Sequence, residues 1–293
     1  MKVSIVTASF NAARTIEETI CSVLSQQDVD LEYIVIDGGS CDGTAEIIRR
    51  HEARLAWWVS EPDQGQTDAL NRGFARATGD VLGFLNADDV LLPGSLRAVC
   101  ERFAEEPAAE IVHGGIEWID IDGRPEGTHF GDISNLDDVL DIYRVWWRER
   151  QWIQPEVFFR RSLWQRVGAF DTRYHLAFDY DFWVRCFLAG AKVAELRRPL
   201  VKFRRHAGQK SADTEAAGRE IRTILGRHLA ARPPIGAWRR LTLGAQLSYD
   251  LYQSSLPDSR PSFAAALVHH PQWLLTTNVR QRLRESLFHH RHP

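Results

Sequence analysis

Two short acidic segments of the chain have the composition of ligand-binding or catalytic sites. Asp88 and Asp89 are adjacent carboxylates that follow an apolar run. Such a pair suits Mg²⁺ or Mn²⁺ bound together with phosphate oxygens, although it also suits a solvated turn. Asp37 precedes two glycines, which let a flat ligand such as a nucleobase approach the backbone, or simply form a tight turn.

Two further residues carry groups that transfer protons or bind metal. Asp179 lies at the predicted start of a helix, where a carboxylate is either a general base for an acceptor hydroxyl or a partner of the helix dipole. His206 is either a metal ligand or a structural histidine. Neither residue decides the function by itself.

Alternating strand and helix patterns in the first hundred residues must position these groups. Apolar runs predict buried strands, and apolar residues at helical spacing predict helices between them. The alternation predicts an α/β fold with a mostly parallel sheet flanked by helices, and ligands bind such sheets beyond the C-terminal strand ends. The expected strands are 3–7, 33–36, 57–59 and 80–85, and the expected helices are 15–25, one around 47–48, 67–77 and one opened by Pro93.

The rest of the chain is more mixed and then becomes helical. A Trp-rich stretch spans residues 146–152, and the pattern beyond Ser211 is helical with a break at 232–234. The sequence thus predicts a catalytic domain followed by a helical C-terminal extension. The expected strands are 111–113 and 116–119, the expected helix is 179–188, and the expected divisions are 1–212 (halves about 1–120 and 121–212) and 213–293.

The order and spacing of these motifs resemble the inverting family 2 glycosyltransferases of the GT-A fold. The resemblance covers about residues 1–212, and Cys41 and Phe178 stand where Thr and Glu are common in the family. The segments that carry it are 3–11 (VSIVTASFN), 37–44 (DGGSCDGT), 61–73 (EPDQGQTDALNRG), 77–80 (ATGD), 86–89 (NADD), 154–161 (QPEVFFRR), 168–171 (GAFD) and 179–185 (DYDFWVR).

This resemblance implies a donor site, a metal site and an acceptor site. Asp179 would be the catalytic base, Asp89 the principal ligand of Mn²⁺ or Mg²⁺, and His206 would complete the metal site. Asp37 would bind the nucleobase, often uracil in this family. The implied donor-binding residues are Thr7, Ser9, Asn11, Asp37, Gly39, Asp68, Asn71 and Asp88, and the implied acceptor residues are Trp152, Gln154 and Asp181.

The implied reaction moves a sugar, with inversion, from a nucleotide diphosphate to a hydroxyl group. A UDP-sugar is the expected donor, and a glycan or lipid-linked molecule is the expected acceptor. A sugar nucleotidyltransferase is one alternative, but the loop after the first strand, residues 8–13, lacks the glycines typical of that class. A non-catalytic nucleotide-sugar-binding protein is the other.

Composition and charge narrow the class of protein. With 44% hydrophobic and 26% charged residues, the chain resembles an ordinary soluble globular protein. Its four cysteines form no C-x-x-C pair, which argues against a zinc ribbon or disulfide framework. We expect a cytoplasmic protein without a signal peptide or membrane-spanning segment, and without a nucleic-acid partner.

The charge is distributed unevenly along the chain. From Arg197 onward there are 17 Lys/Arg and 6 Asp/Glu, so this part carries +11 of a net −3, and the part before it carries −14. The C-terminal segment also mixes Trp238 and Leu241 with Arg239 and Arg240. This pattern suggests that the protein contacts the inner face of an anionic membrane peripherally. It also suits a solvated basic surface, a helical cap on the catalytic domain or a dimer contact.

Overall fold

The computed structural model describes residues 1–254 and 263–281. The chain forms two compact units, residues 1–221 and 222–293. The division falls within helix α8 (Thr214–Ala230), whereas the sequence suggested a boundary just before that helix. The first unit therefore keeps the opening turns of α8.

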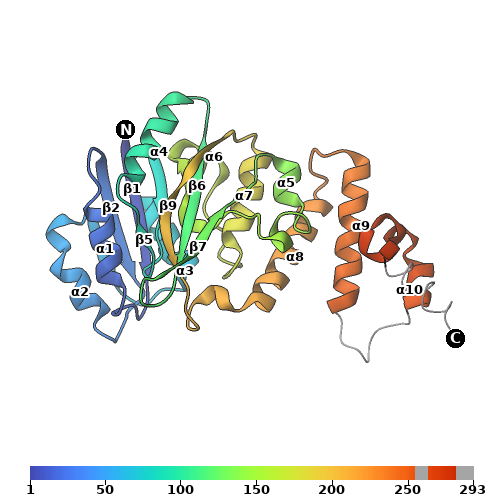
Figure 1. Cartoon of the computed structure of the whole chain (residues 1–293), viewed down its shortest axis with the longest axis horizontal. Coiled ribbons are helices and arrows are strands. Elements are labelled where there is room, and N and C mark those ends of the chain that lie inside the picture. The colour runs from blue at the N-terminus through green and yellow to red at the C-terminus, as the bar shows by residue number, and fades with distance from the viewer. Residues whose placement is uncertain (255–262, 282–293) are drawn as a thin grey trace. The chain divides into compact units, whose positions relative to one another are not determined.

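A nine-stranded mixed sheet forms the centre of the first unit (Figure 1). Its order is β3-β2-β1-β4-β8-β6-β9-β5, and β7 pairs with β6. The strands β1 to β4 are parallel, as the alternation predicts, whereas β5, β7 and β8 add antiparallel pairs in the second half. The bounds are β1 Lys2–Ser9, β2 Asp30–Asp37, β3 Trp57–Ser60, β4 Val81–Phe84, β5 Val90–Leu91, β6 Ile111–Ile119, β7 Pro125–Phe130, β8 Val157–Arg160 and β9 Val193–Arg204.

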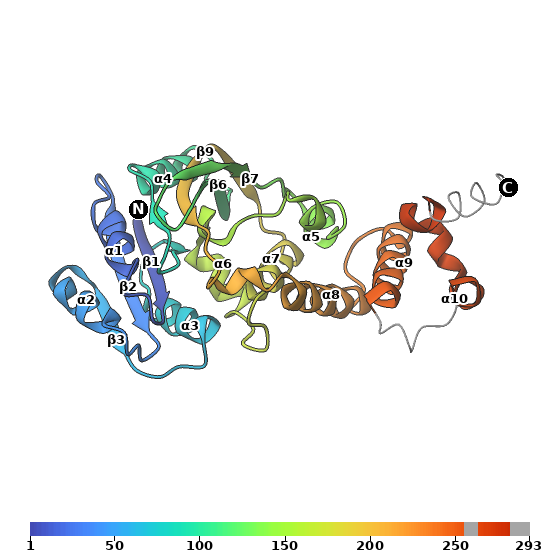
Figure 2. The same ribbon diagram turned by 60° about the horizontal axis from the view of Figure 1, so that its bottom comes forward.

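Helices cover both faces of this sheet because successive strand residues point to opposite sides. Val3 and Ile5 of β1 pack with α1, α2 and α4, whereas Val6 faces α3. Figure 2 shows α1 and α2 on one side of these strands and α3 on the other. The bounds are α1 Ile16–Leu24, α2 Thr44–Arg50, α3 Gln66–Arg76, α4 Ser95–Glu105, α5 Leu136–Leu140, α6 Arg161–Val167 and α7 Phe178–Leu188.

Two expected elements differ in detail. The helix α4 begins at Ser95 rather than at Pro93, because Gly94 takes the left-handed conformation (φ 73°) just before it. The expected strands 111–113 and 116–119 form the single strand β6, whose pairing with β9 is irregular around Gly115.

An aromatic cluster fixes α7 on the α3 side of the sheet. Trp164 of α6 lies 4.9 Å, between ring centroids, from both Phe74 of α3 and Phe170. Phe182 of α7 lies 5.0 Å from Phe170, and it is fully buried. Large buried rings contribute strongly to packing, so the start of α7 is held firmly near the sheet.

The second unit is helical, as the sequence predicts. It contains α9 (Ala237–Ser254), α10 (Phe263–His269) and the short 3-10 helix η6 (Pro271–Leu275), after the break around residues 232–234. Tyr249 and Trp273 pack in a small core of their own, with ring centroids 5.4 Å apart. None of the helices within the described ranges has the length and apolar character needed to cross a membrane.

Candidate active site

The loops that follow β1, β2 and β3 meet at the buried carboxylate of Asp37. One of its oxygens accepts hydrogen bonds from the hydroxyls of Ser9 (2.7 Å) and Ser40 (2.5 Å). The other accepts from the Ser40 backbone N–H (2.9 Å) and the Ser60 hydroxyl (2.6 Å). Burial opposes ionisation, but these bonds hold the pKa of Asp37 below its ordinary value. Asp37 is fully buried and joins the ends of the three strands, and its binding of a nucleobase stays a prediction.

Around Asp37, the loops after β1 and β2 form a rim that includes Asn11 and Gly39, both with unusual backbone conformations. Asn11 has a φ of 50°, and its side-chain oxygen accepts from the Cys41 backbone N–H at 3.1 Å. Gly39 has a φ of 82° and passes so close to Pro62 that an added Cβ would lie 3.1 Å from the Pro62 nitrogen. Both predicted donor residues therefore shape the rim, where only small or permissive residues fit.

A different carboxylate, Asp63, faces this rim. Its oxygen would lie 3.0 Å from a Cβ placed on Gly38, and it accepts from the Gly65 N–H at 2.7 Å. Asp63 is half-buried, unlike Asp37. Asp68, a predicted donor residue, is also half-buried and accepts from the Gln64 N–H at 3.2 Å. Asp63 was missed because only the fold brings it against the first of the two glycines after Asp37.

Two other predicted donor residues have structural partners. Thr7 is fully buried and shares a 3.0 Å hydrogen bond with the Tyr33 hydroxyl. Asn71 bonds the backbone of Phe170 in both directions, at 2.9 Å each, and so joins α3 to the loop before α7. Both side chains hold the framework of the site, and their contact with the donor stays a prediction.

Asp88 and Asp89 follow β4 at the same sheet edge and have different environments. The Asp88 carboxylate lies 3.0 Å from His206 Nε2, and about a quarter of each side chain is exposed. Asp89 is fully buried; its oxygens accept from Asn86 Nδ2 (2.8 Å) and the Arg204 backbone N–H (2.9 Å). Desolvation, with the nearby Asp88 charge, raises the pKa of Asp89 well above its ordinary value. Asp88 with His206 is therefore the more accessible pair in this structure, and the role of Asp89 as principal metal ligand stays a prediction.

Arg204, at the end of β9, fixes the Asp88–Asp89 turn. Its guanidinium donates to the Asp88 backbone carbonyl (2.9 Å) and to Glu18 (2.6 Å). The side chain is 3% exposed, so it cannot meet a ligand phosphate. Arg205 points elsewhere and lies 3.8 Å from the Trp118 ring centroid.

The donor set suits a divalent cation that takes its other ligands from a substrate. Asp88 and His206 supply one oxygen and one nitrogen within hydrogen-bond distance of each other. Among residues 1–254 and 263–281, no group of three or more His, Cys, Asp or Glu side chains forms a metal site. Magnesium is usually held by one or two carboxylates plus substrate phosphates, so two protein ligands fit that mode of binding.

Asp179 lies in the first turn of α7 and is 5% exposed. Burial raises its pKa to about 6, although hydrogen bonds from its own helix N-terminus and from Gln154, and the nearby Lys210 charge, work in the opposite direction. A carboxylate with a pKa near neutrality suits general-base catalysis. The structure therefore brings Gln154, a predicted acceptor residue, next to the predicted base.

Polar contacts connect Asp179 with the Asp88–Asp89 turn. Lys210 interacts electrostatically with Asp179 and donates to Gln66 Oε1 at 3.2 Å. The Gln66 amide donates to Asn86 Oδ1 at 2.9 Å, and Asn86 in turn holds Asp89. Gln66 was not among the predicted site residues, because its role depends on the neighbours that the fold gives it.

Two predicted acceptor residues are inaccessible in this structure. Trp152 is 1% exposed and packs edge-on against Trp183, with centroids 5.5 Å apart. Asp181 is fully buried and pairs with Arg185 at 2.8 Å. Trp152 packs in the core and Asp181 forms a buried ion pair within α7, while their acceptor roles stay predictions.

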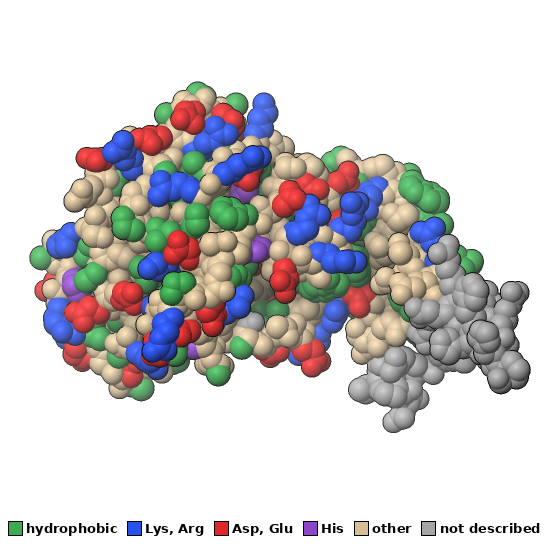
Figure 3. Space-filling view, viewed as in Figure 1, with side chains coloured by type: hydrophobic (Ala, Val, Ile, Leu, Met, Phe, Trp, Pro, Cys, Tyr) green, Lys and Arg blue, Asp and Glu red, His purple; other side chains and the backbone are tan. Residues whose placement is uncertain are grey.

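Charged side chains of both signs cover the visible face of the first unit. Figure 3 shows acidic and basic groups interspersed there, so the negative charge of the early chain does not gather in one patch on that face.

Comparisons with known proteins define the family. A model described as glycosyl transferase family 2 matches residues 4–164. A PGL/p-HBAD biosynthesis glycosyltransferase of Mycobacterium tuberculosis is 31% identical over 202 residues, which cover 68% of this chain and 74% of that protein. A second M. tuberculosis glycosyltransferase is 32% identical over 205 residues, with coverages of 69% and 74%. The chain belongs to glycosyl transferase family 2.

Solved structures agree with this family in fold. S. aureus TarS, residues 1–349 in complex with UDP-GlcNAc, matches with a TM-score of 0.66 and 17% identity, over 87% of this chain and 74% of that one. The mannosyltransferase PcManGT from Pyrobaculum calidifontis, in complex with GDP-Man and Mn²⁺, matches with a TM-score of 0.59 and 20% identity, over 95% and 82%. The predicted GT-A fold is confirmed.

Proposed function

We propose that this glycosyltransferase transfers a sugar from a UDP-sugar to a hydroxyl of a glycan or lipid-linked acceptor, with inversion. The observation that carries the proposal is the connected site: Asp179 is linked through Lys210, Gln66 and Asn86 to Asp89. The adjacent Asp88 lies 3.0 Å from His206. Displacement at an anomeric carbon needs a group near the leaving diphosphate and a base near the attacking hydroxyl. Both kinds of group belong to this one network.

The nucleotide would lie on the rim formed by the loops after β1, β2 and β3. Asn11 and Gly39 shape this rim, and Asp63 presents a half-buried carboxylate there. A carboxylate can accept a hydrogen bond from a base N–H, so we propose that Asp63 takes the role first expected of Asp37. TarS with UDP-GlcNAc supports a uridine nucleotide, while PcManGT with GDP-Man is the contrary precedent.

Asp88 and His206 would hold Mn²⁺ or Mg²⁺ beside the diphosphate. A bound cation supplies Lewis-acid neutralisation of the charge on the departing diphosphate. Asp88 is the acidic member of this pair, and the Arg204 guanidinium fixes its backbone. The Mn²⁺ in the PcManGT complex supports a divalent cofactor.

Asp179 would take the proton from the acceptor hydroxyl as its oxygen attacks the anomeric carbon. Burial gives Asp179 a pKa of about 6, so it is mostly ionised at neutral pH and can accept that proton. Gln154 orients the carboxylate. A single displacement inverts the anomeric configuration and needs no covalent intermediate.

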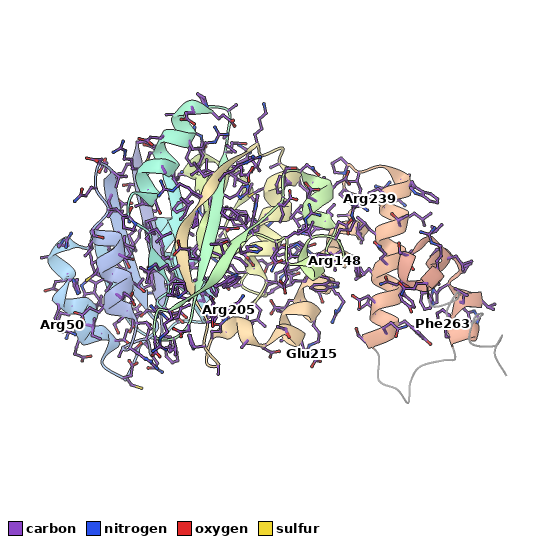
Figure 4. All side chains as sticks on the ribbon, viewed as in Figure 1. Arg50, Arg148, Arg205, Glu215, Arg239 and Phe263 are labelled. Carbon is purple, nitrogen blue, oxygen red and sulfur yellow. The ribbon has the colours of Figure 1, made fainter. Side chains whose placement is uncertain are left out.

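The acceptor side of the proposal includes an anionic membrane at the cytoplasmic face. Trp238 and Leu241 are one helical turn apart at the start of α9, with exposed fractions of 66% and 46%. Arg239 and Arg240 lie between them, and Figure 4 labels Arg239. Exposed aromatic and aliphatic groups flanked by arginine suit the lipid headgroup region. Two further arginines of the basic C-terminal segment, Arg282 and Arg284, lie outside the described residues.

A panel of nucleotide sugars tests the proposal. With Mn²⁺ and no acceptor, we expect slow release of UDP from at least one UDP-sugar, detected by a coupled nucleoside diphosphate assay. Release of pyrophosphate from UTP and a sugar phosphate would instead indicate a nucleotidyltransferase. Binding of nucleotide sugars without any turnover, with or without acceptor, would indicate the non-catalytic alternative.

A further inference from the structure

One carboxylate from α8 holds the loop that leads into α7. The consecutive backbone N–H groups of His175, Leu176 and Ala177 donate to the Glu220 side chain at 3.0, 2.8 and 2.8 Å. Ala177 is the N-cap residue of α7, and its methyl side chain cannot accept a hydrogen bond. Glu220 therefore accepts, from a distant part of the chain, the N–H of the N-cap residue and of the two residues before it. In a capping box a glutamate within the helix accepts the N-cap N–H in the same way.

This loop ends two residues before Asp179. Both ribbon views place the start of α8 beside α7 (Figures 1 and 2). Phe178, between the cap and the base, is fully buried, so the first turn of α7 is fixed on one side by packing and on the other by Glu220. Loss of the carboxylate would release three backbone donors and loosen the turn that carries Asp179.

A second contact connects the two carboxylates. Lys210 interacts electrostatically with both Glu220 and Asp179. Its side chain also donates to Gln66 and lies 5.8 Å from the Phe178 ring centroid. The Lys210 charge is therefore shared between a half-buried acid on α8 and a buried acid on α7.

We propose that Glu220 is a positioning residue for Asp179, and that the catalytic unit continues into α8 rather than ending near residue 212. The inference rests on the proposed function, because it assigns Glu220 a role through Asp179. The proposal gives the start of α8 a part in the reaction. The sequence did not indicate this role, because it placed the helix in the C-terminal extension.

The charges around Asp179 predict the direction in which the pH dependence of kcat should shift when Glu220 is replaced. Asp179 faces Lys210 from η4 (Lys210–Ala212) and the neutral Gln154 from η3 (Gln154–Glu156), while Asp181 on its own helix pairs with Arg185. When the negative charge of Glu220 is removed, Asp179 is the remaining carboxylate that the Lys210 charge stabilises. The acid limb of kcat should then move to lower pH, because the pKa of Asp179 falls.

Kinetics of Glu220→Gln and Glu220→Ala test the role in turnover. Glu220→Gln keeps one acceptor oxygen and removes the charge; Glu220→Ala removes both. We expect kcat to fall roughly tenfold for Gln and up to about a hundredfold for Ala, because a base displaced by about 1 Å loses that much. The donor KM should stay within about twofold, since the nucleotide loops are separate. A purely structural role would lower the active fraction without moving the acid limb.

The matched control is Glu215→Gln on the same helix. Glu215 is 84% exposed and pairs only locally with Arg219 among its described contacts, and Figure 4 labels it on α8. Its kcat, pH profile and thermal midpoint should equal those of the parent. An equal loss in both variants would mean that α8 responds to any change of charge, which would overturn the specific role of Glu220.

Hydrogen exchange supplies a readout that needs no activity. In Glu220→Ala, amide exchange at residues 175–177 should accelerate at least about tenfold, because each N–H loses a charged acceptor. Unchanged exchange, or parental kcat with a parental acid limb, would overturn the inference. If the parent itself turns over no sugar nucleotide, the proposed function fails and the catalytic role of Glu220 fails with it, while accelerated exchange would still confirm the structural contact.

Discussion

Replacement of Asp179 by Asn removes the proposed base while keeping its shape. The side chain is 5% exposed, and burial raises its pKa to about 6. At pH 7 about nine in ten parent molecules then carry the ionised base, and at pH 5 only about one in ten does. General-base catalysis contributes roughly 10²- to 10⁴-fold, so Asp179→Asn should lower kcat at least about a hundredfold.

Steady-state assays of donor turnover between pH 5 and 8 measure this effect. The parent should lose activity below about pH 6, roughly tenfold per pH unit, and the residual activity of Asp179→Asn should lack this acid limb. Affinity for UDP should not change, because Asp179 is not among the nucleotide loops. Asp28→Asn is a suitable control, since Asp28 is 73% exposed and pairs with Arg97 rather than with a residue of the site. Parental turnover in Asp179→Asn would remove Asp179 from the mechanism.

Three further predictions address metal binding, stability and membrane contact. Asp88→Asn should weaken Mn²⁺-dependent UDP binding at least about tenfold in calorimetry, with an unchanged thermal midpoint. Asp89→Ala should instead cost about 1–3 kcal/mol of stability, because it leaves the Arg204 N–H and Asn86 without their acceptor. The reverse pattern would indicate that Asp89 is the metal ligand. Glu32 accepts from Lys2, Ser4 and Thr78, and although burial opposes ionisation these bonds lower its pKa to about 2. Ionised Glu32 therefore contributes roughly 3 kcal/mol to the free energy of unfolding above about pH 4.5, and this contribution is lost as the pH falls toward 2. Urea unfolding at pH 7 and pH 3 should show a smaller pH dependence of stability in Glu32→Gln than in the parent. An equal pH dependence in the two proteins would contradict this assignment. Trp238→Ser with Leu241→Ser should reduce sedimentation with anionic vesicles at low salt, and a parent that never sediments would end the membrane proposal.

The first half of the fold follows closely from local patterns. Each apolar run between residues 3 and 85 became a strand of the parallel half, because buried strands need continuous apolar residues and the helices between them fix the order. The antiparallel additions β5, β7 and β8 depend on pairing partners remote in sequence, which periodicity does not reveal.

The sequence supplied candidate residues for the site, and the structure adds the environment of each. Adjacent residues such as Asp88 and Asp89 look alike in a sequence, yet the structure exposes one toward His206 and buries the other against Arg204. The surroundings of Asp37 were equally hidden, because its four hydrogen-bond donors come from Ser9, Ser40 and Ser60 on three separate segments. Glu220 lacked any local signal, because its role depends on the packing of α8 beside α7.

The central claim concerns where the donor diphosphate and its cation bind. Anomalous diffraction at the manganese edge, from crystals soaked with UDP and MnCl₂, locates the ion directly. The account predicts one manganese peak at the Asp88 carboxylate and His206, with the uracil on the rim beside Asp63 and the diphosphate facing Asp179. A manganese peak at any other group of residues, or UDP bound away from Asp179, would contradict it.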